Sequence, residues 1–256
     1  MNPYQPPSLA AEVGSADPAS QLGGPFTSVF GLLGNAFSLY FGNLPRIAAI
    51  TLAVFGPVNF LKCYLVHAAK IENDISASSR VEMMGESVFG SLVTAALLVA
   101  LAHKIKTGRD LEVREALSRG FKSWGRVFGA RFRAGLYICA GLLLLIVPGV
   151  IWTVKYSLTD EIAVLEVDRS GDRIMARSAE LTQGRWWKIF AVGLLTMILV
   201  TAFQLAGGMV SGLVQLWWFT ALVDCVTDVS FRFYVAVMLL VYLGSKTGAR
   251  GAAIRA

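Results

Sequence analysis

Six apolar blocks divide this chain into pieces of helical length. Their residues are apolar on every side, whereas a helix of a water-soluble protein shows one apolar and one polar face. A helix needs roughly 20 residues to cross the hydrocarbon core of a bilayer, and each block approaches or reaches that length. The blocks predict membrane spans at about 45–66, 87–102, 134–147, 150–167, 187–209 and 229–244.

Two stretches allow more than one interpretation. Pro148-Gly149 is a strong turn signal inside the apolar stretch 134–167, which is therefore either a hairpin of two membrane helices or one kinked helix. We favour the hairpin, because it keeps the two flanking basic loops on the same side of the membrane. The segment 211–228 contains Gly and Trp and is a re-entrant helix, an interfacial helix or part of a span.

Amphipathic helices are predicted beside the spans. Residues 26–41 place a row of Phe side chains on one helical face and polar side chains on the other, which suits a helix lying in the membrane interface. A second amphipathic pattern covers 113–128 and follows Asp110, a plausible N-cap. Ser170 or Asp172 could cap a third helix in the same way.

These three stretches predict a weak internal repeat. Each unit begins with an amphipathic helix, continues through an aromatic or basic elbow and ends in a membrane hairpin. The elbows are expected at 40–42, 124–126 and 186–188. Repeats are common in transporters, but aromatic and basic residues mark helix ends in most membrane proteins, so the repeat alone does not indicate transport.

The two ends of the chain differ from its apolar centre. Residues 1–25 hold five prolines and no Lys or Arg, which predicts a disordered tail. Residues 26–245 form the predicted membrane domain, and residues 246–256 form a basic cytoplasmic tail. The expected fold class is all-α: a polytopic helical membrane protein with about six transmembrane helices and further interfacial helices.

Composition and charge support this interpretation. Apolar residues make up 55% of the 256 residues and charged residues 16%, against about 45–50% and about 25% in soluble domains. With the N-terminus inside, 17 of the 23 Lys and Arg residues fall in inner loops and the C-terminal tail, so the positive-inside rule puts both termini in the cytoplasm. The net charge of +6 is explained by this asymmetry, and we expect no nucleic-acid partner.

The sequence holds no recognisable catalytic or metal-binding motif. Its three Cys and two His lack metal or redox spacing, and it has neither a phosphate-binding loop nor a nucleophile elbow. We therefore expect a protein without enzymatic activity, cofactor or metal.

Ionisable residues at membrane depth are the remaining clue, because a charge there is costly and often functional. Asp224, Asp228 and Arg232 share one helical face at i, i+4 and i+8. Such residues either line a polar pathway or form ion pairs that hold spans together, and we favour the ion pairs. The candidates are Lys62, Lys155, Glu166, Asp224, Asp228 and Arg232.

Lipid is the expected partner of the basic inner surface. Helices rich in Arg and aromatic residues suit the interface, and clustered basic residues attract anionic head groups. The candidate head-group contacts are Arg126, Arg177, Trp187 and Lys188. We expect contact with the bilayer, with anionic lipids as the candidate specific partners.

A pattern in the second half of the chain resembles a known family. The pattern is Val147-Pro148-Gly149, then Glu166, Arg177-Ser178, Leu181-Thr182, Gly184 and Trp187. It resembles the membrane domain attached to some bacterial glycerophosphoryl diester phosphodiesterases, which also occurs alone in bacterial membrane proteins of unassigned function. Ile174-Met175 departs from the Ala-Leu common in the family. The resemblance implies a stand-alone protein of the bacterial inner membrane, without the phosphodiesterase chemistry of the separate soluble domain.

Two functional hypotheses follow from these observations. The first is a non-enzymatic membrane protein with an envelope- or lipid-associated role. The alternative is a transporter or channel for a small solute or a lipid, which would use the intramembrane charged residues.

Overall fold

The computed structural model describes residues 28–68, 85–169, 171–214 and 216–255. The predicted disordered tail, 1–25, lies outside these residues. The elements are α2 (Val29–Gly42), α3 (Leu44–Ala68), the π-helical turn η1 (Glu86–Gly90), α5 (Ser91–Thr107), α6 (Val113–Leu144), α7 (Ile146–Lys155), α8 (Thr159–Leu165), α9 (Asp172–Thr182), α10 (Trp186–Leu213), α11 (Trp217–Phe231) and α12 (Phe233–Arg255). Because α12 runs on to Arg255, most of the predicted tail 246–256 continues a helix.

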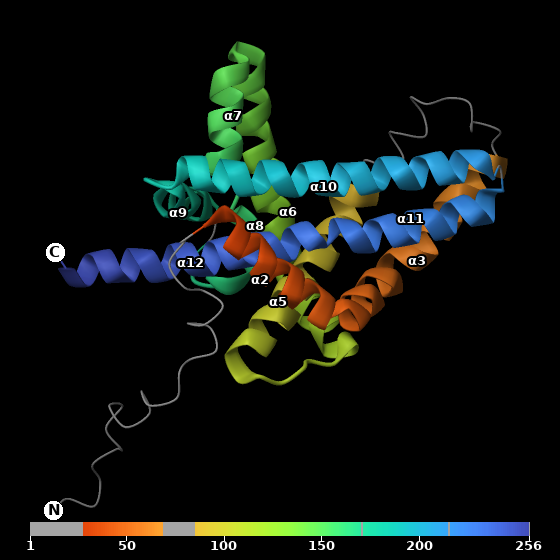
Figure 1. Ribbon diagram of the computed structural model, residues 1–256, viewed down its shortest axis with the longest axis horizontal. Coiled ribbons are helices and arrows are strands. Elements are labelled where there is room, and N and C mark those ends of the chain that lie inside the picture. The colour runs from red at the N-terminus through yellow and green to blue at the C-terminus, as the bar shows by residue number, and fades with distance from the viewer. Residues whose placement is uncertain (1–27, 69–84, 170, 215, 256) are drawn as a thin grey trace, which may run out of the picture.

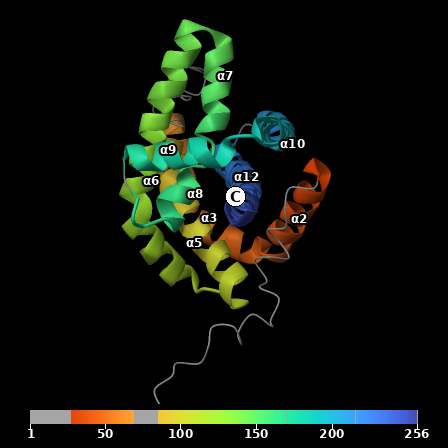
Figure 2. The ribbon, with the colours of Figure 1, turned by 90° about the vertical axis from the view of Figure 1, so that its left-hand side faces the viewer.

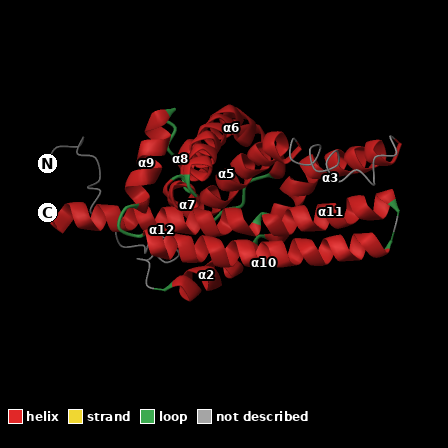
Figure 3. Ribbon diagram, turned by 90° about the horizontal axis from the view of Figure 1, so that it is seen from above, coloured by secondary structure: helices red, strands yellow, loops and turns green. Residues whose placement is uncertain are grey.

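The helical class of the prediction is confirmed. All regular structure in the described ranges is helical (Figure 3). Within these ranges, five helical segments are long and apolar enough to cross a membrane, so the chain has the features of a multi-pass membrane protein. The segments are Leu44–Ala68, Glu86–Thr107, Val113–Leu144, Trp186–Leu213 and Trp217–Thr247.

The structure differs from the six expected spans in the stretch 134–167. The turn lies at Leu145, whose backbone is extended (φ −165°, ψ 148°), so α6 and α7 form a hairpin. Pro148 falls in the first turn of α7, where its missing N–H costs no hydrogen bond. The expected fourth span is divided between α7, with 10 residues, and α8, with 7. Lys155, Asp160 and Glu161 interrupt the apolar run there.

The segment 211–228 does not form a helix of its own. Its first residues end α10 and the remainder forms α11, which continues into α12 after a slight break at Arg232. Figures 1 and 3 show α10 lying beside the α11–α12 pair along the longest dimension of the molecule. Helix α3 packs along α11, so three long apolar helices share one direction at that end.

Helix breaks lie directly beside two of the three expected elbows, 40–42 and 186–188, but not at those residues. One lies at Asn43 between α2 and α3, and another separates α9 from α10 at 183–185. Gly184 takes the left-handed conformation there, with φ +74°. The elbow expected at 124–126 is wrong, because α6 runs unbroken from its amphipathic half into its apolar half. The repeat is therefore interrupted in its second unit.

The predicted caps are also corrected. Asp110 does not cap α6, whose N-cap position is Glu112. The Asp110 carboxylate instead pairs with Lys104 at 2.9 Å and with Arg46, and these hydrogen bonds lower its pKa. Helix α9 is preceded by Gly171, which takes a positive φ of +57°, and Asp172 is the first residue of the helix rather than its cap. Ser170 lies outside the described residues.

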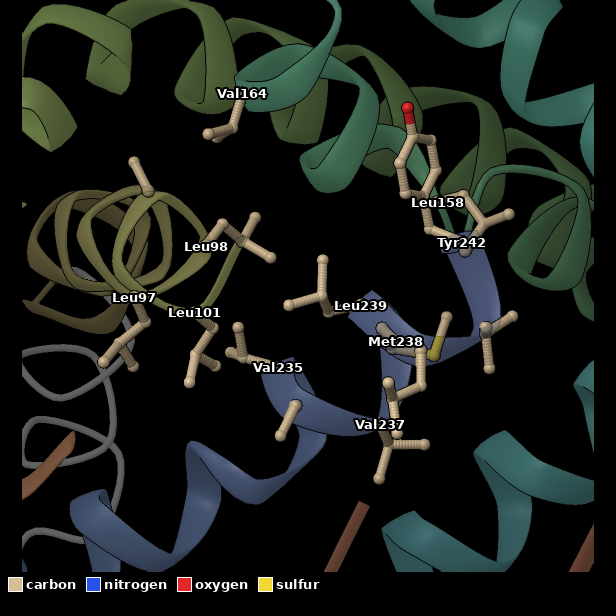
Figure 4. Close-up of a cluster of buried hydrophobic side chains, with 14 of the residues drawn as sticks. Leu97, Leu98, Leu101, Leu158, Val164, Val235, Val237, Met238, Leu239 and Tyr242 are labelled. Carbon is tan, nitrogen blue, oxygen red and sulfur yellow. The ribbon is translucent and has the colours of Figure 1, made fainter. Parts of the chain in front are cut away.

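The core is built around the first half of α12. Residues 235–242 are all nearly inaccessible to solvent. Figure 4 shows Leu97, Leu98 and Leu101 of α5 converging on this part of α12, with Leu158 near its far end. This part of α12 is therefore covered by protein on all sides and forms the axis of the molecule.

Candidate functional site

Helices α3 and α11 meet along a row of polar side chains. Lys62 Nζ lies 2.8 Å from Asp224 Oδ2. One turn further along, Asn59 Nδ2 donates to Asp228 Oδ2 at 2.7 Å. The predicted common face of Asp224 and Asp228 is therefore present, and it points toward α3. Each carboxylate has a partner on α3, but only the contact of Asp224 with Lys62 is an ion pair.

Arg232 has a different partner from those expected. Its side chain is fully buried at the joint between α11 and α12, and its two terminal nitrogens contact the carboxylate of Glu86 at 3.1 and 3.2 Å. The guanidinium also lies over the rings of Phe55 and Phe231, 4.9 and 5.3 Å from their centroids. The charge is thus neutralised by a fork-shaped contact and covered by aromatic faces.

The π-helical turn η1 brings Glu86 to this site. A side chain at Gly90 would collide with the Glu86 carboxylate, so the absence of a Cβ gives the acid room to fold over the turn. Such π-helical turns are rare and occur frequently at functional sites. The glycine and the irregular turn therefore together set the position of the acid that faces Arg232.

These polar groups open onto a cavity of about 660 Å³ between α3, η1, α10 and α11. Its polar lining includes Asn59, Lys62, Glu86, Asp224 and Asp228. The remaining wall is mainly apolar, with residues such as Phe55, Phe89, Leu65 and Val223. A concave, mostly apolar site with a few convergent polar groups is the usual form of a small-molecule pocket. We call it the α3–α11 pocket.

The charges around the α3–α11 pocket do not cancel. Among the described residues, Lys62 pairs with Asp224, and Arg232 pairs with Glu86. The hydrogen-bond partner of Asp228 is the uncharged amide of Asn59. Within the described part of the chain, this leaves one negative charge in excess over the five groups.

Two of the six predicted pathway residues lie elsewhere. Lys155 ends α7 and lies over the ring of Tyr156, at 5.6 Å from the centroid. Glu166 follows α8 and contacts Arg169 at 2.6 Å and the hydroxyl of Tyr242 at 2.9 Å. The six residues are therefore divided. Four lie at or beside the α3–α11 pocket, Lys155 lies apart from it, and Glu166 lies in the non-helical residues 166–169 after α8, which we call the Glu166 turn.

The predicted head-group contacts divide in a similar way. Arg126 donates to the backbone carbonyls of Glu166 and Arg169 at 2.9 and 2.7 Å, and Arg177 pairs with Glu180 at 2.8 Å. Both arginines thus hold protein groups around the Glu166 turn. Trp187 is 75% exposed and Lys188 is also exposed, as side chains at a membrane interface would be. Their contact with lipid stays a prediction.

Sequence reasoning missed Asn59 and Glu86. Both had a detectable signal: Asn59 is an amide in the middle of an apolar block, three residues before Lys62, and Glu86 directly precedes a block. Their distance in sequence from α11 concealed the pairing, because 169 positions separate Asn59 from Asp228. The packing of α3 against α11 brings Asn59 to Asp228, and the turn η1 brings Glu86 to Arg232.

A second buried acid lies outside the five candidate spans. Glu161 of α8 is 2% exposed, and its Oε2 has no hydrogen-bond partner among the described residues. Burial, followed by the charge of Asp160, raises the pKa of Glu161 to about 8. The folded protein therefore binds a proton that the unfolded chain releases near pH 4.5, and stability declines as pH rises from there through about 8.

We expect Glu161→Gln to remove this pH dependence. Near pH 3.5 the variant and the parent protein should melt alike, because the acid is then largely protonated in both the folded and the unfolded state. By pH 8.5 the variant should melt at least about 3 °C higher, because the parent protein then carries a buried carboxylate that the glutamine lacks. Thermal unfolding in detergent across this pH range measures the difference. If the melting temperatures of the two proteins change with pH by the same amount, the assignment is wrong.

Comparisons with known proteins give no identification. No family model, no curated protein and no solved structure matches the chain. Within the described residues, no group of three or more His, Cys, Asp or Glu side chains is placed to hold a metal ion.

Proposed function

We propose that this chain is a non-enzymatic, multi-pass protein of the bacterial inner membrane that binds a small, singly charged organic cation in the α3–α11 pocket. The observation that carries the proposal is the cavity of about 660 Å³ lined by Asn59, Lys62, Asp224 and Asp228 between apolar helices. Ion pairs that only hold helices together need no such cavity. The pocket therefore supports solute binding, and with it the transport hypothesis, better than bracing alone.

The charge balance selects a cation. Asp228 is hydrogen-bonded to a neutral amide, whereas the neighbouring acids pair with Lys62 and Arg232. A ligand with one positive charge would restore neutrality beside Asp228. The aromatic lining, including Phe55 and Phe89, suits an organic cation. Ring faces attract its positive charge, and the apolar walls contact its hydrocarbon groups. Inorganic cations would leave this apolar wall unused.

The topology within this proposal keeps both termini in the cytoplasm. The start of α10 and the end of α12 then lie on the inner side, with the exposed Trp187 and Lys188 at the interface. The resemblance to the membrane domain of glycerophosphoryl diester phosphodiesterases remains part of the proposal. A lipid-associated role is the second candidate function, and the exposed apolar hairpin α6–α7 favours it.

Equilibrium binding of radiolabelled tetraphenylphosphonium to the full chain in nanodiscs tests the proposal. This probe carries a permanent single charge and apolar rings. We expect saturable binding near one molecule per chain, weakened about 10-fold or more by Asp228→Asn, a loss of about 1.4 kcal/mol or more. Triphenylphosphine oxide, which is uncharged, should not compete.

Asp172→Asn is the matched control, because Asp172 is an exposed acid on α9, outside the pocket lining. It should bind the probe like the parent protein. Both variants must elute as single species of the same size, so that lost binding is not lost folding. Absence of saturable binding, or equal binding by Asp228→Asn, would overturn the proposal.

A further inference from the structure

The α6–α7 hairpin does not run in the direction of the long apolar helices. Figure 2 views the molecule along its longest dimension, so that α10 and α12 are seen end-on while α6 and α7 lie in the plane of the picture. Figure 1 shows the same crosswise arrangement, with the hairpin standing out from the side of α10. If α10 and α11 follow the membrane normal, the hairpin lies along the membrane plane.

The tip of this hairpin is apolar and uncovered. Leu143, Leu144, Leu145, Ile146 and Val147 are 67–89% exposed. The two helices pack tightly on each other, because Gly141 and Gly149 let their backbones approach closely. The facing sides of α6 and α7 thus cover each other, whereas the outer surface and the tip of the hairpin need an apolar environment.

The length of the hairpin argues against a bilayer crossing. Helix α7 has 10 residues, about 15 Å of helix, whereas the hydrocarbon core is about 30 Å thick. The end of α7 is held on the inner side, where Ser178 Oγ donates to the carbonyl of Lys155 at 2.8 Å. Lys155 and Ile151 share a pocket with Trp186, the first residue of α10. The hairpin therefore lies at the level where α10 begins.

We propose that the α6–α7 hairpin is embedded lengthwise in a single leaflet, the one nearest the start of α10, and contacts lipid acyl chains with its tip. Amphipathic or apolar helices in such a position are buried near the boundary of head groups and acyl chains. The hairpin adds volume to one leaflet only. The inference goes beyond ligand binding, because it does not depend on the α3–α11 pocket.

This placement changes the topology that composition suggests. If the long helix α6 follows the membrane plane, four of the five candidate segments are left as crossings: Leu44–Ala68, Glu86–Thr107, Trp186–Leu213 and Trp217–Thr247. Four crossings are an even number, so both termini stay on the same side. The segment Val113–Leu144 is long enough to be a candidate span because α6 joins an interfacial helix to one arm of the hairpin.

Spin-label depth measurements on the full chain in vesicles of phosphatidylcholine and phosphatidylglycerol test the placement. Cys139 is exposed, whereas Cys63 and Cys225 are buried, so the parent protein takes a label on the hairpin. Leu144→Cys and Ile151→Cys, each combined with Cys139→Ser, report the tip and the returning helix. Collision with oxygen and with a water-soluble nickel complex gives the depth of each label.

We expect the three hairpin labels to lie at one depth within about 3 Å, all accessible to oxygen. Leu194→Cys and Leu205→Cys on α10, each combined with Cys139→Ser, calibrate the depth scale. Both sites are exposed and lie 11 residues apart on α10. If α10 follows the membrane normal, their depths should differ by about 16 Å. A tip label deeper than Cys139 by about 7 Å, or one reaching the outer leaflet, overturns the proposal. Dipolar broadening with lost oxygen access at Leu144→Cys would show a second copy covering the tip, and overturns it equally.

Discussion

Glu86→Gln is expected to lower the free energy of unfolding by about 3 kcal/mol. Breaking a buried ion pair from one side typically costs about 3–5 kcal/mol, because the remaining charge is left without compensation. Here that charge belongs to Arg232, whose side chain has no exposed surface, while Glu86 is 36% exposed. The partial exposure of the acid puts the expected loss at the lower end of the range.

The melting temperature of the purified protein in detergent measures this effect. A loss of about 3 kcal/mol corresponds to about 6–12 °C in a protein of this size. Glu115→Gln is the matched control, because Glu115 pairs with Arg119 at 2.5 Å on the surface of α6, where both side chains are about half exposed. Surface pairs of this kind contribute about 0–1 kcal/mol, so the control should melt within about 2–3 °C of the parent.

The double variant Glu86→Leu/Arg232→Met separates charge from packing. Replacing both members of a buried pair by apolar residues is often neutral or stabilising. It should therefore recover most of the stability that Glu86→Gln loses. If Glu86→Gln and Glu115→Gln melt alike, the pair does not hold the α11–α12 joint.

The long apolar helices could be predicted from the sequence because their signal is local. A block that is apolar on all sides and about 20 residues long has few other uses. What the sequence could not supply was which block faces lipid. Helices α10 and α12 are both strongly apolar, but α10 exposes residues such as Leu194 and Ile198 whereas α12 is buried over 235–242. Exposure depends on neighbours that are far away in the chain.

The candidate site shows the same limit. The common face of Asp224 and Asp228 followed from helical periodicity alone. The partners did not: Arg232 shares a helical face with Asp224 and Asp228 in the sequence pattern, but it pairs with Glu86, 146 positions earlier. The local spacing of i and i+4 made an intrahelical pair the simplest choice. The break at the α11–α12 joint turns the guanidinium toward η1 instead.

The Arg-rich inner side was interpreted from composition, which does not distinguish lipid from protein partners. Arg126 extends toward two backbone carbonyls in the Glu166 turn, and no local pattern predicts a contact across 40 positions. A turn without regular structure has carbonyls that need donors, and Arg126 of α6 donates to two of them. The Glu166 turn is thus held on several sides.

Glu166→Gln is expected to loosen this turn at a cost of about 2–3 kcal/mol. The carboxylate is 12% exposed, contacts Arg169 at 2.6 Å and lies 3.6 Å from Arg177. It also accepts a hydrogen bond from the hydroxyl of Tyr242 on α12 at 2.9 Å. Glutamine keeps the shape and one acceptor but removes the charge, and hydrogen bonds to charged groups contribute about 1.5–3 kcal/mol.

Limited trypsin digestion, read together with the melting temperature, localises the effect. Arg169 and Arg173 flank the turn, so Glu166→Gln should speed cleavage there several-fold, because local opening controls access. Glu180→Gln is the matched control: Glu180 also pairs with Arg177 but is 62% exposed, and its loss should change melting by less than about 1 kcal/mol. Tyr242→Phe should fall between the two, because it removes one hydrogen bond and leaves the charges in place. Equal cleavage rates in Glu166→Gln and Glu180→Gln would mean that the arginine contacts to the backbone, and not the Glu166 carboxylate, hold α9 against α12.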